Sequence, residues 1–109
     1  MKYQVRILPQ AEEDIERNAK WWAEHRNSDE AVKWFFAVRD QLESLGKFPS
    51  RCPVSAENDD FDREIRDLIV GPGRTYRAVF TIEDDVVNVL AVRRSDEGRL
   101  HSVDFPTAE

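Results

Sequence analysis

Residues 63–94 read REIRDLIVGPGRTYRAVFTIEDDVVNVLAVRR. The stretch contains three runs that are rich in β-branched and apolar residues, at 63–70, 75–82 and 86–94. Short polar or glycine-containing connectors of the kind found in hairpins separate them. The stretch therefore predicts a three-stranded antiparallel meander.

The residues before this stretch predict one strand and two helices. Residues 3–8 alternate weakly between apolar and polar side chains, which indicates a short strand that ends at Pro9. An apolar stripe with helical spacing then runs over residues 11–23, and a second one runs over residues 31–45. Polar residues at 27–30 separate the two stripes and suit the start of a helix. Two helices joined by so short a link pack antiparallel, as a helical hairpin.

The aromatic faces of these helices need a further layer, and the meander can supply it. The first strand must join the same sheet, because an isolated strand is not stable. We therefore predict an α+β fold in the order β-α-α-β-β-β, with the N-terminal strand, the helical hairpin and the meander in one domain over residues 1–94. Residues 47–62 are expected to form a loop without a regular element, and residues 95–109 a C-terminal tail.

Composition limits the class of protein. The chain has 109 residues with 16 basic and 22 acidic side chains, a net charge of −6, which argues against nonspecific affinity for nucleic acids. Its sequence contains neither a membrane-spanning segment nor a signal-peptide core, so we expect a cytoplasmic protein. Cys52 is the single cysteine and there are two histidines, so we expect no internal disulfide, no metal and no cofactor.

Four arginines are the main candidates for a functional site, because they lie within or at the end of the three predicted strands. Guanidinium groups bind phosphate bidentately and stay charged, so neighbouring strands could build an anion site from them. Each could instead pair with one of the many acidic residues, such as Asp67 or Glu83, and the sequence leaves both interpretations open. The candidates are Arg66, Arg77, Arg93 and Arg94.

The histidines and tryptophans carry weaker predictions. His25 falls at the expected end of the first helix, where a cation suits the helix dipole, and His101 in the tail is a candidate acid or base or a solvated side chain. Trp22 and Trp34 have the spacing of core residues, whereas Trp21 lies off the main stripe. An exposed aromatic side chain at that position would suggest a surface for protein contact.

Three segments of the predicted sheet together resemble a known family of small proteins. They are RDLIVG at 66–71, YRAVFTI at 76–82 and VVNVLAVRR at 86–94, and the opening PQAEEDI at 9–15 fits as well. From about residue 3 to residue 94 the chain resembles the RelE/ParE superfamily of toxins from bacterial type II toxin–antitoxin systems, with the ParE-like branch favoured. The resemblance implies a cytoplasmic toxin that a cognate antitoxin neutralises, in a toxin–antitoxin hetero-oligomer.

The resemblance implies two possible targets. ParE-like toxins inhibit DNA gyrase by binding it, and the long aromatic helices and low isoelectric point favour this branch. RelE-like toxins are metal-independent, ribosome-dependent mRNA endonucleases, for which Arg66, Arg77, Arg93 and Arg94 resemble the phosphate-holding arginines and either His101 or Glu97 would supply the acid or base. The expected tyrosine at the end of the last strand is absent. A third interpretation is a non-toxic interaction protein that retains the scaffold.

Overall fold

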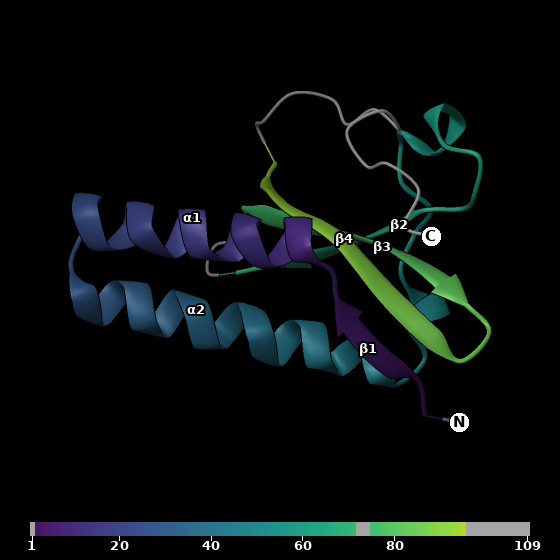
Figure 1. Ribbon diagram of the computed structural model, residues 1–109, viewed down its shortest axis with the longest axis horizontal. Coiled ribbons are helices and arrows are strands. Elements are labelled where there is room, and N and C mark those ends of the chain that lie inside the picture. The colour runs from purple at the N-terminus through teal and green to yellow at the C-terminus, as the bar shows by residue number, and fades with distance from the viewer. Residues whose placement is uncertain (1, 72–74, 96–109) are drawn as a thin grey trace.

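The computed structural model describes residues 2–71 and 75–95 of the chain. The elements follow the predicted order, with one strand, two helices and then three strands (Figure 1). Strand β1 is Gln4–Ile7, helices α1 and α2 are Pro9–His25 and Ser28–Glu43, and strands β2, β3 and β4 are Arg66–Val70, Tyr76–Glu83 and Val86–Arg94.

The helix boundaries follow from local chemistry. Pro9 occupies the first turn of α1, where its fixed φ suits a helix and its missing N–H costs nothing. Asn27 caps α2, because its side-chain oxygen accepts a 2.8 Å hydrogen bond from the backbone N–H of Glu30. The predicted break between the two helices is therefore confirmed at the capping residue itself.

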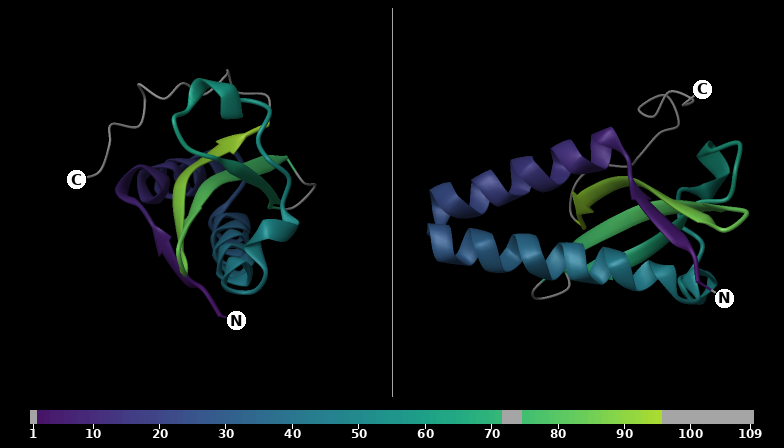
Figure 2. Two further views of the ribbon diagram at one scale, coloured as in Figure 1. Left: turned by 90° about the vertical axis from the view of Figure 1, so that its right-hand side faces the viewer. Right: turned by 60° about the horizontal axis from the view of Figure 1, so that its bottom comes forward.

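The four strands form one sheet in the order β1-β4-β3-β2. Strands β2, β3 and β4 pair antiparallel in sequence, which confirms the predicted meander. Strand β1 joins the same sheet as expected, but it pairs parallel with β4, from Gln4 opposite Val86 to Ile7 opposite Val89. The sheet is therefore mixed, and the helical hairpin lies along one of its faces and extends beyond its edge (Figure 2).

Residues 47–62 contain more regular structure than the sequence predicts. Two single turns of 3₁₀-helix form there, at Pro49–Arg51 and Asn58–Asp60. Each is followed by a backbone hydrogen bond, from the Cys52 N–H to the Pro49 carbonyl and from the Phe61 N–H to the Asn58 carbonyl. So short a turn has no hydrophobic period, so the prediction of no regular element was wrong here.

The two faces of the sheet are covered differently. The face under the helices carries most of the core, including Trp34 and Phe80. The other face holds a smaller cluster of Ile65, Val79 and Leu90, with Phe61 from the preceding loop packed against it. We call these the helix face and the loop face.

A bulge in β4 changes which residues reach each face. The pairing with β3 shifts between Val79 and Phe80, whose partners on β4 are Ala91 and Val89, so Leu90 is the extra residue. Side chains on the helix face therefore change from odd numbers, such as Val89, to even numbers, such as Val92.

A buried carboxylate fastens α1 to β4 just beyond this bulge. Asp14 is fully buried and its Oδ2 accepts a 3.0 Å hydrogen bond from the backbone N–H of Val92. Its Oδ1 lies 3.1 Å from a guanidinium nitrogen of Arg17 and accepts a 3.1 Å bond from the Gln10 amide. Strand β1 has already left β4 at this point, so the carboxylate replaces a strand neighbour.

We expect Asp14→Ala to lower the free energy of unfolding by about 2 kcal/mol, because it leaves the Val92 N–H buried without its acceptor. Urea unfolding followed by circular dichroism measures the change. Glu13→Ala, at the exposed neighbouring position, is the control and should shift stability by less than about 0.5 kcal/mol. Equal effects from the two variants would contradict the anchoring role of Asp14.

Neither helix within residues 2–71 and 75–95 has the length and apolar character needed to cross a bilayer.

Candidate functional site

The four predicted arginines divide between the two faces of the sheet. Arg66 pairs with Phe80 and Arg94 with Tyr76, so both lie on the helix face, four residues apart along β3. That separation corresponds to roughly 13 Å along the strand. Arg77 and Arg93 lie directly opposite each other on the loop face. The structure therefore brings Arg77 and Arg93 together, and it leaves Arg66 and Arg94 apart from them and from each other.

Arg77 is held by two acidic side chains. Its guanidinium lies 2.5 Å from Glu57 Oε1 and 3.4 Å from Asp67 Oδ2. The side chains of Arg77 and Glu57 are only 14% and 8% exposed. Glu57 comes from the loop before β2 and Asp67 from β2 itself, so this network ties the loop to the sheet. We call Glu57, Asp67 and Arg77 the loop-face network.

Burial and charge shift the pKa values within this network. Burial acts to lower the pKa of Arg77, but the hydrogen bonds and charges of Glu57 and Asp67 together outweigh it, so the guanidinium pKa is raised. Burial also raises the pKa of Asp67, against the opposing charge of Arg77. Arg77 therefore stays charged and lies between Glu57, with which it forms a short ion pair, and Asp67, whose carboxyl pKa is raised.

The raised pKa of Asp67 predicts a pH dependence of stability. The folded protein keeps this proton to a higher pH than the unfolded chain, whose carboxyl has the ordinary pKa of 3.8. The stability that this proton contributes is therefore present below pH 3.8 and is lost as pH rises through the folded-state pKa.

We test this by comparing the wild type with Asp67→Asn in urea unfolding at successive pH values. The stability of the wild type relative to the variant should fall as pH rises above 3.8, by at most about 1.4 kcal/mol per pH unit for a single proton. A difference that stays constant, or that grows with pH, would contradict the assignment.

Arg66 has a local role at the edge of the helix face. Its guanidinium lies 3.0 Å from Glu64 and donates to the backbone carbonyls of Ser50 and Cys52. These contacts hold the 3₁₀ turn at Pro49–Arg51 against the start of β2.

Arg93 lies beside the carboxylate that anchors α1, with its Nε 4.0 Å from Asp14 Oδ2. Two arginines directly opposite each other on a sheet repel unless acidic groups compensate them. Here the compensation comes from Glu57 and Asp67 beside Arg77 and from Asp14 beside Arg93.

The fourth arginine lines a pocket that the sequence did not predict. The pocket has a volume of about 490 Å³ and lies between the C-terminal part of α1 and the adjoining ends of β3 and β4. Three aromatic and two arginine side chains share its lining with Thr75 and Ser95; they are Trp21, Trp22, Tyr76, Arg26 and Arg94. We call it the aromatic–arginine pocket.

The three tryptophans are buried or exposed as the sequence predicts. Trp34 is buried, and Trp22 is half-buried with its indole N–H donating a 3.2 Å hydrogen bond to the Tyr76 hydroxyl. Trp21 is 38% exposed, as its position off the apolar stripe predicts. The sequence could have indicated the pocket only through this exposed aromatic and the neighbouring Arg26, since Tyr76 and Arg94 are far away along the chain.

Comparison with known families identifies the fold and the family together. A family model described as the ParE toxin of the type II toxin–antitoxin system parDE matches residues 5–98. The chain belongs to the ParE toxin family. This confirms the resemblance seen in the sequence, including the preference for the ParE-like branch. No curated protein matches the chain.

Solved structures agree with the ParE-family assignment at the level of the fold. One, described as a chromosomal ParDE toxin–antitoxin system from P. aeruginosa, superposes with a TM-score of 0.70 at 14% identity, over 85% of this chain and 96% of that one. Another, a mutant of the E. coli toxin RelE in the free state, gives a TM-score of 0.53 at 15% identity, over 88% and 86% of the two chains.

The remaining site predictions for this ParE-family chain concern histidines and metals. His25 ends α1 as expected, and its Nδ1 lies 3.0 Å from the Trp21 carbonyl oxygen. His101 falls outside the described residues. Among the residues that the structure does describe, no three acidic, histidine or cysteine side chains gather where they could hold a metal ion.

Proposed function

We propose that this ParE-family protein is a toxin that acts by binding DNA gyrase, and that a cognate antitoxin holds it inactive. The loop-face network is the observation that favours binding over cleavage. Its arginine is engaged by two carboxylates of the same chain, at 2.5 and 3.4 Å. The family assignment over residues 5–98 supports the ParE-type target.

RNA cleavage without a metal would need several cations that converge on one phosphate group. In this chain Arg66 and Arg94 lie on one face of the sheet and Arg77 and Arg93 on the other. A phosphate at Arg77 would also have to displace both carboxylates, which would then repel it. The arrangement therefore favours a toxin whose sheet arginines stabilise the fold and whose outer surface binds the target.

The target is tested by inducing the protein in bacteria and following labelled thymidine and labelled methionine in the same culture. We expect thymidine incorporation to fall first, because gyrase inhibition stops replication before translation. A first fall in methionine incorporation would support the RelE-like alternative, and no fall in either would support a non-toxic interaction protein. A supercoiling assay with purified gyrase then tests direct inhibition.

The antitoxin is the second part of the proposal. The P. aeruginosa structure is described as a ParDE toxin–antitoxin system, and its fold is similar to that of this chain. We expect the product of a short gene beside the one for this protein to co-purify with it and to restore thymidine incorporation when both are expressed. Continued growth arrest despite co-expression would argue against that product as the antitoxin.

A further inference from the structure

The outward surface of α2 carries two apolar side chains one helical turn apart. Val32 is 54% exposed and Phe36 is 60% exposed, although α2 contributes its other side to the core. The Phe36 ring meets the half-buried Phe35 ring edge to face, with centroids 5.5 Å apart. A single exposed apolar side chain is ordinary, but two neighbouring ones form a patch that suits a protein contact.

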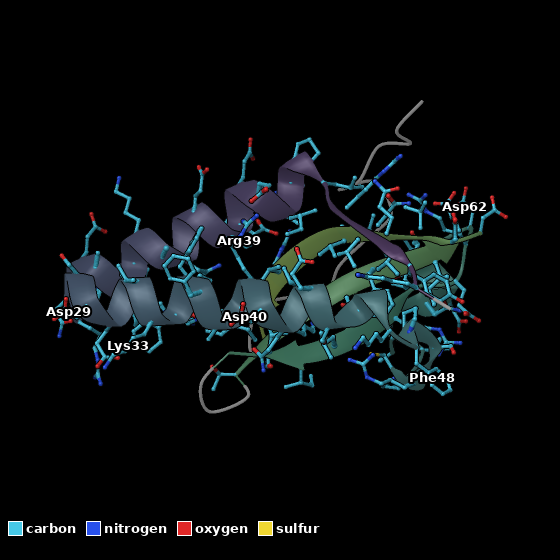
Figure 3. All side chains as sticks on the ribbon, turned by 90° about the horizontal axis from the view of Figure 1, so that it is seen from below. Asp29, Lys33, Arg39, Asp40, Phe48 and Asp62 are labelled. Atoms are coloured by element: carbon cyan, nitrogen blue, oxygen red, sulfur yellow. The ribbon has the colours of Figure 1, made fainter. Side chains whose placement is uncertain are left out.

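Two oppositely charged side chains flank Phe36 on the same side of α2. Lys33 lies three residues before it and Asp40 four residues after it, so the three lie on successive turns of one helix face (Figure 3). Both charged side chains are exposed, and neither has an ion-pair partner within the described part of the chain. Arg39, the other basic residue of α2, already lies 2.9 Å from Glu12. Lys33 is therefore the cation of α2 that is available to a partner.

This helix face is complementary to a second copy of itself. A two-fold axis at right angles to α2 places two copies of the helix antiparallel, so each residue meets the one that lies equally far along the helix on the other side of the axis. With the axis at the midpoint between Phe36 and Ala37, the two Phe36 side chains meet beside it, and the small Ala37 lets the helices approach. Lys33 of each copy then faces Asp40 of the other, because these two residues are equally far from the midpoint.

Charges farther along α2 favour a crossed arrangement of the two helices. Asp29 and Glu43 lie about 10 Å from the midpoint at 1.5 Å per residue, and helices with parallel axes would bring Asp29 of each copy close to Glu43 of the other. At the crossing angle of about 50° that is common between helices, these ends diverge. Lys33 and Asp40 lie only about 5 Å from the midpoint and stay within reach of each other.

We propose that this protein forms a homodimer through α2, with the two Phe36 side chains at a two-fold axis and two ion pairs between Lys33 of one copy and Asp40 of the other. A second copy is the partner that fits, because one helix face carries the apolar side chain and both charges in self-complementary positions. One helix from each copy buries less area than a standard interface, so we expect a weak dimer. The inference goes beyond the proposed function, since it requires neither gyrase nor an antitoxin.

Charge reversals on α2 test this geometry, because each one places like charges opposite each other twice in a symmetric dimer. Sedimentation equilibrium of the full-length protein, up to about 1 mM and at about 0.15 M salt, measures the dimerisation constant. We expect Lys33→Glu and Asp40→Lys each to weaken dimerisation at least tenfold. The controls Lys20→Glu and Glu16→Lys make the same changes of net charge at exposed positions of α1, and they should stay within about twofold of the wild type.

Two rescue experiments separate this contact from a general effect of charge. The double variant Lys33→Glu/Asp40→Lys exchanges the two charges and should restore dimerisation to within about threefold of the wild type. An equimolar mixture of the two single variants should form a mixed dimer, because both acidic side chains of one copy then face both lysines of the other. Native mass spectrometry identifies the mixed dimer by its mass. Absence of rescue in both experiments would overturn the proposal.

A separate pair of variants tests the apolar centre of the contact. Phe36→Ala removes the side chain beside the axis and should weaken dimerisation at least tenfold. Phe48→Ala removes an aromatic side chain that is 69% exposed beyond the end of α2, and it should stay within about twofold of the wild type. Circular dichroism checks that each variant remains folded.

Three other outcomes would contradict the proposal. A wild-type protein that stays monomeric at about 1 mM does not dimerise through α2 or any other surface. A dimer that the α2 variants leave intact uses a different surface. If the wild type is monomeric and Phe36→Ala instead weakens binding of a co-purifying antitoxin, the face belongs to that complex. Loss of toxicity or of gyrase inhibition would contradict the proposed function alone.

Discussion

Arg77→Ala is expected to lower the free energy of unfolding by about 3–5 kcal/mol, the usual cost of removing one partner from a buried ion pair. The loss of stability comes from the two carboxylates that remain in the variant. Glu57 and Asp67 stay in place with side chains 8% and 17% exposed, and both lose the Arg77 guanidinium that they contact. Urea unfolding at neutral pH measures the loss.

The matched control is Arg63→Ala. Arg63 also pairs with a glutamate, Glu83, at 3.3 Å, but these side chains are 34% and 56% exposed. Water screens such a pair, so its loss should cost less than about 1 kcal/mol. A similar loss from both variants would show that the loop-face network contributes no more than a surface pair.

A triple variant separates a structural role of Arg77 from a catalytic one. Replacing Arg77 by Met, Glu57 by Leu and Asp67 by Asn removes the charges but keeps similar volumes. Because no buried charge is then left unpaired, the variant should recover most of the stability lost by Arg77→Ala. Under the proposed function it should still inhibit gyrase. A stable triple variant that has lost all toxicity would instead assign Arg77 a direct part in the activity.

Trp34→Ala should have an effect of similar size, about 3–5 kcal/mol, because it removes the largest fully buried side chain of the core. Trp34 lies on α2 and its ring meets that of Tyr76 edge to face, with centroids 5.1 Å apart. It therefore joins the helical hairpin to the sheet. Thermal and urea unfolding measure the loss.

Two further variants show which property of Trp34 matters. Its indole N–H has no hydrogen-bond partner among the described residues, so Trp34→Phe loses packing but no bond and should cost much less than alanine. Trp21→Ala removes the same side chain from a site that is 38% exposed and should change stability by about 0.5 kcal/mol or less. Equal losses from Trp21→Ala and Trp34→Ala would contradict the core position of Trp34.

The sequence was a good guide to the elements and to the class of fold. The apolar stripes of the two helices repeat over several turns, and Asn27 supplies a capping side chain between them. The turn between β3 and β4 was equally plain, since Asp84 adopts the left-handed conformation that aspartate tolerates. Each of these signals depends on residues only a few positions apart.

Local sequence patterns could not predict the faces and the partners of the sheet arginines. Alternation along β4 assigns faces correctly only up to Leu90, because the bulge there reverses odd and even positions from Ala91 onward. The pairing of Arg77 with Glu57 joins residues twenty positions apart, across a loop whose path no pattern predicts. The candidate anion site thus depended on long-range geometry, as did the aromatic–arginine pocket.

The parallel pairing of β1 with β4 has a consequence for how the protein is made. The first strand of the chain finds its only strand partner in the last strand of the described sheet, so the ribosome must synthesise everything between them before the sheet can close. Contacts between distant parts of a chain also slow folding once synthesis is complete. The sheet of a nascent chain therefore cannot close until β4 has been made, which gives an antitoxin already present time to meet the chain before it is folded.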